Sequence, residues 1–382
     1  MYNRLLSVNK MLDRSFFLWG PRQSGKTTFL REHFPDAHWI NLLYSDQLMK
    51  YQAEPYMLRR ELKQLRKRPD WVIIDEVQKV PSLLNEVHAL IEEEGIRFGL
   101  CGSSARKVRH GHANLLGGRA LKFLLYGLSA SEIGKDVSLT RLLQHGYLPT
   151  FYDENMLGPV HAAYAGDYLK EEVAAEGLIR NLPAFSNFLK LASLSDTEIL
   201  NYSTFARDVG VSSQTIKEYY EILVDTLIGS FLPSYQRKKK RRVRGAPKFY
   251  FFDVGIVNYL SNRGLPLPRS PMFGKAFENW VMHELQCYKA YRNEIMELHY
   301  WALSSGIEVD FILGDMEVAI EAKAAEKVTS DHCKGLVEIA KDYNLRRRIL
   351  VCMVSTSYRR DDGIEVCSWS DFLAELWSDQ LL

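Results

Sequence analysis

The segment GPRQSGKT at residues 20–27 combines residue types and a spacing that can bind phosphate. Gly20 and Gly25 let the backbone bend, so that successive N–H groups point inward around phosphate oxygens. The pattern G-x-x-x-x-G-K-[ST] is that of a phosphate-binding loop, in which the lysine contacts the β- and γ-phosphates and the hydroxyl binds Mg²⁺. The predicted nucleotide ligands are Gly20, Pro21, Arg22, Gln23, Ser24, Gly25, Lys26, Thr27 and Thr28.

Two carboxylates, Asp75 and Glu76, end the apolar run of WVIIDEVQKVP. In ATPases with a phosphate-binding loop, an acid at the end of such a strand holds Mg²⁺ and a following glutamate polarises the attacking water. Taken singly, each motif has an ordinary alternative: a glycine-rich turn with an exposed lysine, or an acidic corner between a strand and a loop. In this order and spacing, the two motifs together predict that the chain binds ATP with Mg²⁺, and the acid pair favours hydrolysis.

Further polar residues follow the next apolar run. FGLCGSSARKV ends in Ser103 and Ser104, and Ser103 is predicted to sense the γ-phosphate, unless it only caps a helix. Arg119 in LLGGRA is a candidate ligand of the γ-phosphate, and the alternative is an ordinary surface arginine. The sequence leaves open whether Arg119 acts in its own chain, in a neighbouring copy within a homo-oligomer, or not at all.

These residues need a scaffold that brings the ends of several strands together. From Phe16 to about Leu128, short apolar runs alternate with amphipathic stretches, which predicts an α/β fold with a parallel sheet and helices on both faces. The pattern is helical from about Leu139 to Leu232 and mixes strands and helices from Pro247 onward. We therefore expect a P-loop core at 1–135, a helical region at 136–246 and an α/β domain at 247–382.

The middle region contains a helix-turn-helix pattern, STFARDVGVSSQTIKEYYEIL. Ser203 or Thr204 is expected to cap the first helix, and Ser212 or Ser213 the second. A cluster of basic residues follows and predicts a wing that binds nucleic acid through its phosphates, although an ordinary solvated charge run is the alternative. The predicted DNA ligands are Arg237, Lys238, Lys239, Lys240, Arg241, Arg242 and Arg244.

The segment GIEVDFILGDMEVAIEAK at 306–323 alternates apolar and polar residues on both sides of a Gly-Asp pair. A two-residue turn at Gly314-Asp315 predicts a hairpin in which Leu313 faces Met316 and Asp310 faces Ala319. The apolar face would comprise Val309, Phe311, Leu313, Val318, Ile320 and Ala322. The polar face would comprise Glu308, Asp310, Glu317, Glu321 and Lys323.

Asp310 and Glu321 would lie close enough in this hairpin to repel each other unless a positive charge separates them. A divalent cation would fill this position, position a water and neutralise a scissile phosphate, with Lys323 beside it. Glu278, on the helix predicted at Phe273–Leu285, is a candidate further ligand. The alternatives are a solvent-exposed face with ion pairs between the strands, and a site that binds DNA without cutting it.

The overall composition restricts the function classes. The net charge is only +2, so any attraction for nucleic acid must come from a local patch. The five cysteines include no CxxC pair, which argues against a zinc site or a disulfide framework. The N-terminus has no signal-peptide core and no apolar run is long enough to cross a bilayer, so we expect a soluble cytoplasmic protein.

Several motifs in order resemble one group of proteins. The chain resembles prokaryotic AAA-type P-loop ATPases related to the STAND NTPases. The motifs that carry this resemblance are, in order, GPRQSGKTT, WVIIDEVQKVP, CGSSARK, LLGGRA, HGYLP, PKFYFFDVGIVNYL, FGKAFENWVMHEL and EVDFI. The resemblance implies ATP hydrolysis by an AAA-like core, a winged-helix module and a C-terminal PD-(D/E)xK nuclease-like fold. It would give Glu76 and Lys26 catalytic roles, and likewise Asp310, Glu321 and Lys323 in the nuclease-like constellation, where Val309 replaces the usual proline.

The sequence therefore favours Mg²⁺-dependent ATP hydrolysis by a protein that engages DNA. Two alternatives stay open at this stage. One is an ATP-regulated, Mg²⁺-dependent DNA nuclease that uses the C-terminal carboxylates. The other is a regulatory ATPase whose inactive nuclease-like domain binds a partner.

Overall fold

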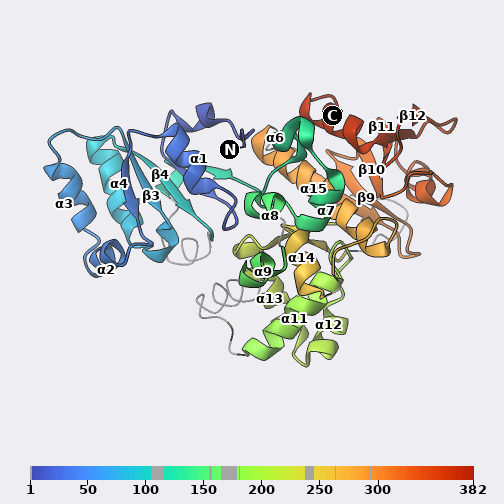
Figure 1. Ribbon diagram of the computed structural model, residues 1–382, viewed down its shortest axis with the longest axis horizontal. Coiled ribbons are helices and arrows are strands. Elements are labelled where there is room, and N and C mark those ends of the chain that lie inside the picture. Colours follow the sequence, from blue (N-terminus) through green and yellow to red (C-terminus); the bar gives the residue numbers. More distant parts are fainter. Residues whose placement is uncertain are drawn as a thin grey trace. The chain divides into compact units, whose positions relative to one another are not determined.

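Figure 1 shows the computed structural model of the chain. It describes residues 2–104, 116–154, 157–164, 179, 181–236, 245–262, 264–292 and 295–382. The chain forms two compact units, which are described separately. The first unit comprises Met1–Leu128 together with Asp225–Ile228, and the second comprises Ser129–Val224 and Gly229–Leu382.

The first unit contains a five-stranded parallel sheet whose strand order is β2-β3-β4-β1-β5. Its strands and main helices are β1 (Phe16–Trp19), α1 (Lys26–His33), β2 (His38–Asn41), α2 (Ser45–Ala53), α3 (Met57–Gln64), β3 (Trp71–Asp75), α4 (Leu83–Glu94), β4 (Arg97–Gly102) and β5 (Leu121–Leu124). The continuous apolar runs become central strands because helices cover the sheet and exclude water from it. The predicted α/β class with a parallel sheet is confirmed.

The parallel arrangement brings the carboxyl ends of β1, β3 and β4 to one edge of this sheet. The phosphate-binding loop leaves β1, Asp75 ends β3 and Ser103 follows β4. The strand pairing thus brings together the phosphate-binding loop, Asp75 and Ser103, which were predicted from three separate sequence motifs.

The second unit begins with helices and continues into two sheets. Its helices are α6 (Ala130–Ile133), α7 (Leu139–His145), α8 (Pro149–Asp153), α9 (Leu157–His161), α11 (Leu182–Leu194), α12 (Tyr202–Val209), α13 (Ser213–Asp225), α14 (Val254–Leu260), α15 (Pro271–Tyr291), α16 (Lys334–Ile339) and α17 (Trp369–Trp377). Its strands are β6 (Gly229–Leu232), β7 (Lys248–Phe251), β8 (Leu298–Ala302), β9 (Glu308–Leu313), β10 (Val318–Lys323), β11 (Arg347–Cys352), β12 (Tyr358–Arg359) and β13 (Glu365–Ser368).

The helix-turn-helix pattern folds as α12 and α13, followed by the antiparallel pair β6–β7. The cap predicted for the first helix is wrong, because Asn201 accepts the N–H of Thr204 and the helix already begins at Tyr202. Ser212 does cap the second helix, through the N–H of Thr215 at 3.0 Å. Residues 197–200 run beside β7 and exchange backbone hydrogen bonds with it, which adds a third extended segment to this small sheet.

The C-terminal sheet is mixed, with the strand order β12-β13-β11-β10-β9-β8. The hairpin register predicted between β9 and β10 is wrong. The turn contains four residues, 314–317, and Leu313 pairs with Val318. A shift of two residues keeps the alternation of faces, but it moves Asp310 to the position opposite Glu321.

Strand β9 also contains a bulge at Asp310. Val309 pairs with Trp301 and Ile312 pairs with His299, so Asp310 and Phe311 both lie opposite Tyr300. Because of this extra residue, Val309 joins Ile312 in one apolar cluster with α16 instead of sharing a face with Phe311 as predicted. Within the predicted polar face, Asp310 and Glu321 are buried, at 1% and 5% exposed, whereas Glu317 is exposed to solvent.

All five cysteines are buried and carry free thiols. Among the described residues, no helix is long and apolar enough to cross a membrane.

Candidate functional site

The phosphate-binding loop has a backbone that only particular residues allow. Gly25 has φ +91°, in the left-handed region that favours glycine, and Gln23 also has a positive φ. A Cβ at Gly20 would overlap the backbone carbonyl oxygen of Leu125, so only glycine fits there. Ser24 Oγ is buried and has no hydrogen-bond partner among the described residues. The loop therefore adopts a preformed turn that ends at the N-terminus of α1, where a phosphate is favoured.

Lys26 is 6% exposed, and its ammonium donates to the carbonyl oxygens of Gly20 and Pro21, both at 2.8 Å. Burial lowers the pKa of this lysine, although the nearby Glu76 and Asp75 partly oppose that effect. The ammonium is thus held against its own loop by neutral carbonyl groups. A phosphate would offer it charged oxygens at the same edge of the sheet.

Thr27 and Asp75 are joined directly, since the threonine hydroxyl donates to Asp75 Oδ2 at 2.8 Å. The other carboxylate oxygen, Oδ1, accepts the N–H of Glu76 at 3.1 Å and the thiol of Cys101 at 2.7 Å. A hydroxyl and a carboxylate are the oxygen ligands that Mg²⁺ prefers. The donor set at this position therefore fits a Mg²⁺ ion bound together with a nucleotide.

Glu76 adopts a left-handed conformation, with φ 60° and ψ 41°, and is 8% exposed. Burial raises the pKa of its carboxyl, which suits a general base better than an ordinary exposed glutamate. Its carboxylate accepts the side-chain amide of Gln78, and the same amide donates to Ser103 Oγ at 3.1 Å. Ser103 was predicted from the sequence, but Gln78, which links Ser103 to Glu76, was not.

Arg119 lies away from this edge. It precedes β5, whose first residue Leu121 pairs with Phe16 at the amino end of β1, and its guanidinium binds Glu92 near the end of α4. The phosphate-binding loop lies at the opposite, carboxyl end of β1. The position does not favour a contact with a nucleotide in the same chain, and an action on a neighbouring copy stays a prediction.

The predicted DNA-binding residues Arg237, Lys238, Lys239, Lys240, Arg241, Arg242 and Arg244 lie outside the described residues. The exposed side chains of the neighbouring helix α13 are described, and they include Lys217 but also Glu218 and Glu221. This helix surface therefore offers more negative than positive charge.

The second cluster of functional residues lies around the β9–β10 hairpin. Lys248, at the start of β7, is 1% exposed, and its ammonium lies 3.0 Å from Glu278 Oε1 and 3.1 Å from Asp310 Oδ1. Glu308 Oε1 lies 3.6 Å from the same nitrogen. The structure thus brings the predicted Glu278 and Asp310 together, but around a lysine that the sequence analysis missed.

A second lysine neutralises the other part of the cluster. Lys323 Nζ lies 2.5 Å from Glu321 Oε1 and 3.5 Å from Asp310 Oδ2. Asp310 Oδ2 also accepts the N–H of Ala322 at 3.0 Å. Within the part of the chain that the structure describes, Glu321 Oε2 is buried and has no hydrogen-bond partner. Both oxygens of Asp310 are therefore engaged by protein donors.

The electrostatics follow from burial and from these lysines. Burial raises the pKa of Glu321 to about 8, with the charge of Asp310 acting in the same direction. Burial would also raise the pKa of Asp310, but Lys323, Lys248 and the Ala322 N–H together hold it below its usual value. Burial opposes the charge on Lys248, yet Glu278 and its other neighbours raise the pKa of this lysine well above the ordinary value.

This arrangement does not fit the divalent cation that a nuclease-like fold implies. A metal needs ionised oxygens that converge on one point with no donor between them. Here an ammonium lies between Glu278 and Asp310, and burial raises the pKa of the Glu321 carboxyl, which disfavours its ionised form. Among the described residues, no group of three or more histidine, cysteine, aspartate or glutamate side chains is placed to hold a metal ion.

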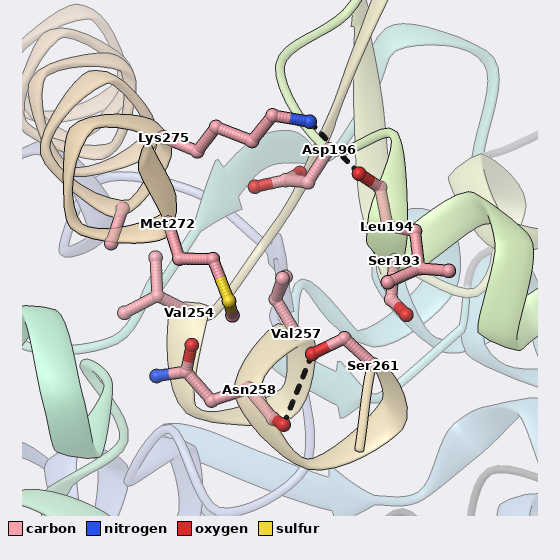
Figure 2. Close-up of a pocket in the computed structure, with 10 residues that line it drawn as sticks. Ser193, Leu194, Asp196, Val254, Val257, Asn258, Ser261, Met272 and Lys275 are labelled. Atoms are coloured by element: carbon pink, nitrogen blue, oxygen red, sulfur yellow. Dashed lines mark hydrogen bonds between the residues drawn. The ribbon is translucent and has the colours of Figure 1, made fainter. Parts of the chain in front are cut away.

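Figure 2 shows a small cavity in the second unit, where Lys275 and Met272 of α15 face residues of α11 and α14. The Lys275 ammonium donates to the carbonyl oxygen of Leu194 at 2.8 Å. The cavity volume is about 20 Å³, which is room for about one water. The cavity is therefore too small for a nucleotide or a base.

The family comparisons agree with the geometry of the first unit. Residues 13–134 match the model of an AAA domain. The first third of the chain is therefore similar to AAA domains, in agreement with the phosphate-binding loop of the first unit. Residues 137–266 match a domain of unknown function, DUF8612, and residues 273–372 match another, DUF4143.

Three curated relatives are similar to the chain, and each is described as an uncharacterized protein. Those of Mycobacterium bovis and Mycobacterium tuberculosis are each 24% identical over 304 residues, which is 77% of this chain and 66% of theirs. The chain thus spans about two thirds of the length of these mycobacterial proteins. A protein of Haemophilus influenzae is 21% identical over 406 residues, covering 98% of both chains.

Solved structures give weaker likenesses. The Aeropyrum pernix Orc1 protein in complex with DNA has a TM-score of 0.24 and 13% identity, over 65% of this chain and 87% of its own. Domain III of the Thermotoga maritima replication initiation protein DnaA has a TM-score of 0.24 and 16% identity, over 57% of this chain and 88% of its own. A Pyrococcus horikoshii STAND ATPase has a TM-score of 0.22 and 11% identity, over 74% of this chain and 49% of its own. Such TM-scores assign neither a common overall fold nor a function.

Proposed function

We propose that the chain is a Mg²⁺-dependent ATPase. The observation that carries this proposal is the convergence of Lys26, Thr27, Asp75 and Glu76 at the carboxyl ends of β1 and β3, with Thr27 hydrogen-bonded directly to Asp75. A phosphate-binding loop alone would support binding. The buried glutamate beside the carboxylate that would hold the metal supports hydrolysis.

Each residue has a separable role in this proposal. Lys26 exchanges the carbonyl oxygens of Gly20 and Pro21 for phosphate oxygens, and the inward N–H groups of the loop bind the remaining ones. Thr27 and Asp75 would hold Mg²⁺, which would neutralise charge on the phosphates. Glu76 accepts the proton of the attacking water, and Gln78 orients the Glu76 carboxylate.

Two substitutions test this proposal. Lys26→Ala should lose nucleotide binding, whereas Glu76→Gln should bind ATP and lose turnover by at least about 100-fold, the lower end of the range for general acid–base catalysis. Binding is measured with a fluorescent ATP analogue and turnover by phosphate release, with Lys122→Ala on exposed β5 as the control. If Glu76→Gln hydrolysed ATP at the wild-type rate, another residue would be the base.

We further propose that the protein engages DNA through the basic segment at 237–244. Helices α12 and α13 followed by the β6–β7 pair are typical of a winged helix, and seven of the eight residues of that segment are basic. Because the exposed side chains of α13 carry more negative than positive charge, we expect the basic segment at 237–244, and not α13, to contact the DNA phosphates. Replacing its seven basic residues with serine should weaken binding and flatten its dependence on salt. Unchanged binding to a DNA duplex would exclude the segment as the contact.

In the second unit, the ammonium groups of Lys248 and Lys323 among the carboxylates favour binding of DNA without cleavage over a Mg²⁺-dependent nuclease. The test is incubation of plasmid and single-stranded DNA with Mg²⁺ or Mn²⁺, with and without ATP. No cleavage is expected. Cleavage that disappears in Asp310→Ala would instead establish the nuclease.

A further inference from the structure

The acid cluster of the second unit already contains its counter-charges. The Lys248 ammonium has three N–H donors, and three carboxylates surround it within 3.6 Å: Glu278 from α15 and Glu308 and Asp310 from β9. Tyr250 supports this geometry by donating to Glu278 at 2.7 Å. A side chain that is 1% exposed and surrounded in this way is part of the folded core rather than a surface lysine.

The bulge in β9 explains how Asp310 reaches this lysine. An extra residue in one strand re-aims the side chains beside it, and here Asp310 is one of the two residues that oppose Tyr300. Its Oδ1 accepts Lys248 at 3.1 Å, while its Oδ2 accepts the Ala322 N–H at 3.0 Å. Asp310 thereby connects β7 to the β9–β10 hairpin through charge-assisted hydrogen bonds.

We propose that Lys248 is the resident cation of this cluster, and that a divalent metal can bind at Asp310 only after the Lys248 ammonium has left. A divalent ion at the same carboxylate would lie within a few ångströms of two ammonium groups, which repel it. Removal of the Lys248 charge leaves Glu278 and Asp310 side by side, with only the Lys323 ammonium, 3.5 Å from Asp310 Oδ2, to offset their charge. That pair, with Glu321 next to it, is the oxygen-rich arrangement that attracts Mn²⁺ or Mg²⁺.

This proposal is independent of ATP hydrolysis, because it concerns only residues of the second unit. It also predicts a specific gain. Lys248→Met keeps an unbranched side chain of similar length but no charge, so it should create a metal site that the wild-type chain lacks. Lys248→Arg retains the charge and should not create one.

The experiment measures Mn²⁺ binding to the full chain without nucleotide, by calorimetry and by the electron paramagnetic resonance signal of free Mn²⁺. Wild type, Asp310→Asn and Lys248→Arg should bind the same number of ions. Lys248→Met should bind one more, at least tenfold more tightly than any site of the wild type, and Lys248→Met/Asp310→Asn should lose it. Lys275→Met removes a lysine of α15 that lies outside the cluster, so it is the matched control and should gain no ion.

Two results would overturn the proposal. One is a wild-type chain that binds one Mn²⁺ more than Asp310→Asn does, because the metal would then coexist with Lys248. The other is a folded Lys248→Met chain, verified by circular dichroism, that gains no ion. If Lys248→Met does not fold, the comparison of wild type with Asp310→Asn still decides, since equal binding supports the proposal and unequal binding refutes it.

Discussion

Asp253 offers a stringent test of how the second unit is held together. Its Oδ2 accepts the N–H groups of Tyr147 at 2.6 Å and Leu148 at 3.0 Å, and its Oδ1 accepts those of Gly255 at 2.8 Å and Ile256 at 3.2 Å. One carboxylate therefore caps α14 and also holds the turn between α7 and α8. The motifs HGYLP and FFDVG, more than a hundred residues apart, meet at this buried group.

Asp253→Asn is the informative perturbation. Asparagine keeps the shape but must turn its NH₂ group toward one of the two pairs of N–H donors, leaving two buried donors without an acceptor. Each unsatisfied buried donor costs about 1–3 kcal/mol, so the free energy of unfolding should fall by about 2–6 kcal/mol. Asp253→Ala removes both acceptors and should cost more than Asp253→Asn.

The assay is urea unfolding followed by tryptophan fluorescence, with thermal unfolding alongside. A loss of 2–6 kcal/mol corresponds to a lower Tm by roughly 4–24 °C in a unit of this size, at about 2–4 °C per kcal/mol. Asp361→Asn, at an exposed aspartate of the same unit, should change stability by less than about 0.5 kcal/mol. If Asp253→Asn were as stable as that control, the four hydrogen bonds would not contribute as argued, and the junction would depend on packing alone.

Three further predictions address the nucleotide site and pH. Gly20→Ala should abolish ATP binding, measured by thermal shift with ATP, because its Cβ would overlap the Leu125 carbonyl oxygen; binding at the wild-type level would mean that the loop can rearrange. Gln78→Leu should lower kcat about tenfold with little change in KM. It should also move the acidic limb of the pH profile of kcat to higher pH, because loss of the amide raises the pKa of Glu76 further. If that limb did not move, Gln78 would have a purely structural role. Burial raises the pKa of Glu284 to about 8, so the folded state retains a proton that the unfolded state releases near pH 4.5. The stabilisation that this proton gives is complete below pH 4.5 and is lost as the pH rises toward 8. The free energy of unfolding should fall by up to about 1.4 kcal/mol per pH unit in this range. Urea unfolding at pH 6 to 8 should show a shallower pH dependence in Glu284→Gln, and equal slopes would contradict the assignment.

The placement of the phosphate-binding loop and of Asp75-Glu76 was predictable because its signals are local. The phosphate-binding loop, the strand before it and the helix after it are contiguous, and the apolar run ending in Asp75-Glu76 identifies a buried strand. Gln78 lies only two residues beyond Glu76, yet nothing in a single sequence distinguishes it from any other polar residue after a strand. Its role comes from β4, which brings Ser103 beside it.

The C-terminal cluster was only partly predictable, for physical reasons. Alternation predicted the hairpin, but alternation cannot reveal a bulge, because one extra residue changes the faces without changing the residue types. Lys248 is 62 residues before Asp310 and follows a strongly basic segment, where any lysine resembles surface charge. Its burial depends on β7 lying beside α15 and β9, which is a property of the tertiary fold.

The first unit has a consequence for how the protein is made. Its short returning segment, Asp225–Ile228, supplies the buried Thr226 and Ile228, and Leu227 packs on the core of the parallel sheet. At about 5–20 residues per second, a ribosome reaches this segment about 5–20 s after Leu128, so the first unit stays incomplete while most of the helical region is translated. A fragment that stops before Asp225 would lack these core residues, and a single proteolytic cut between the two segments would not release the unit as one piece.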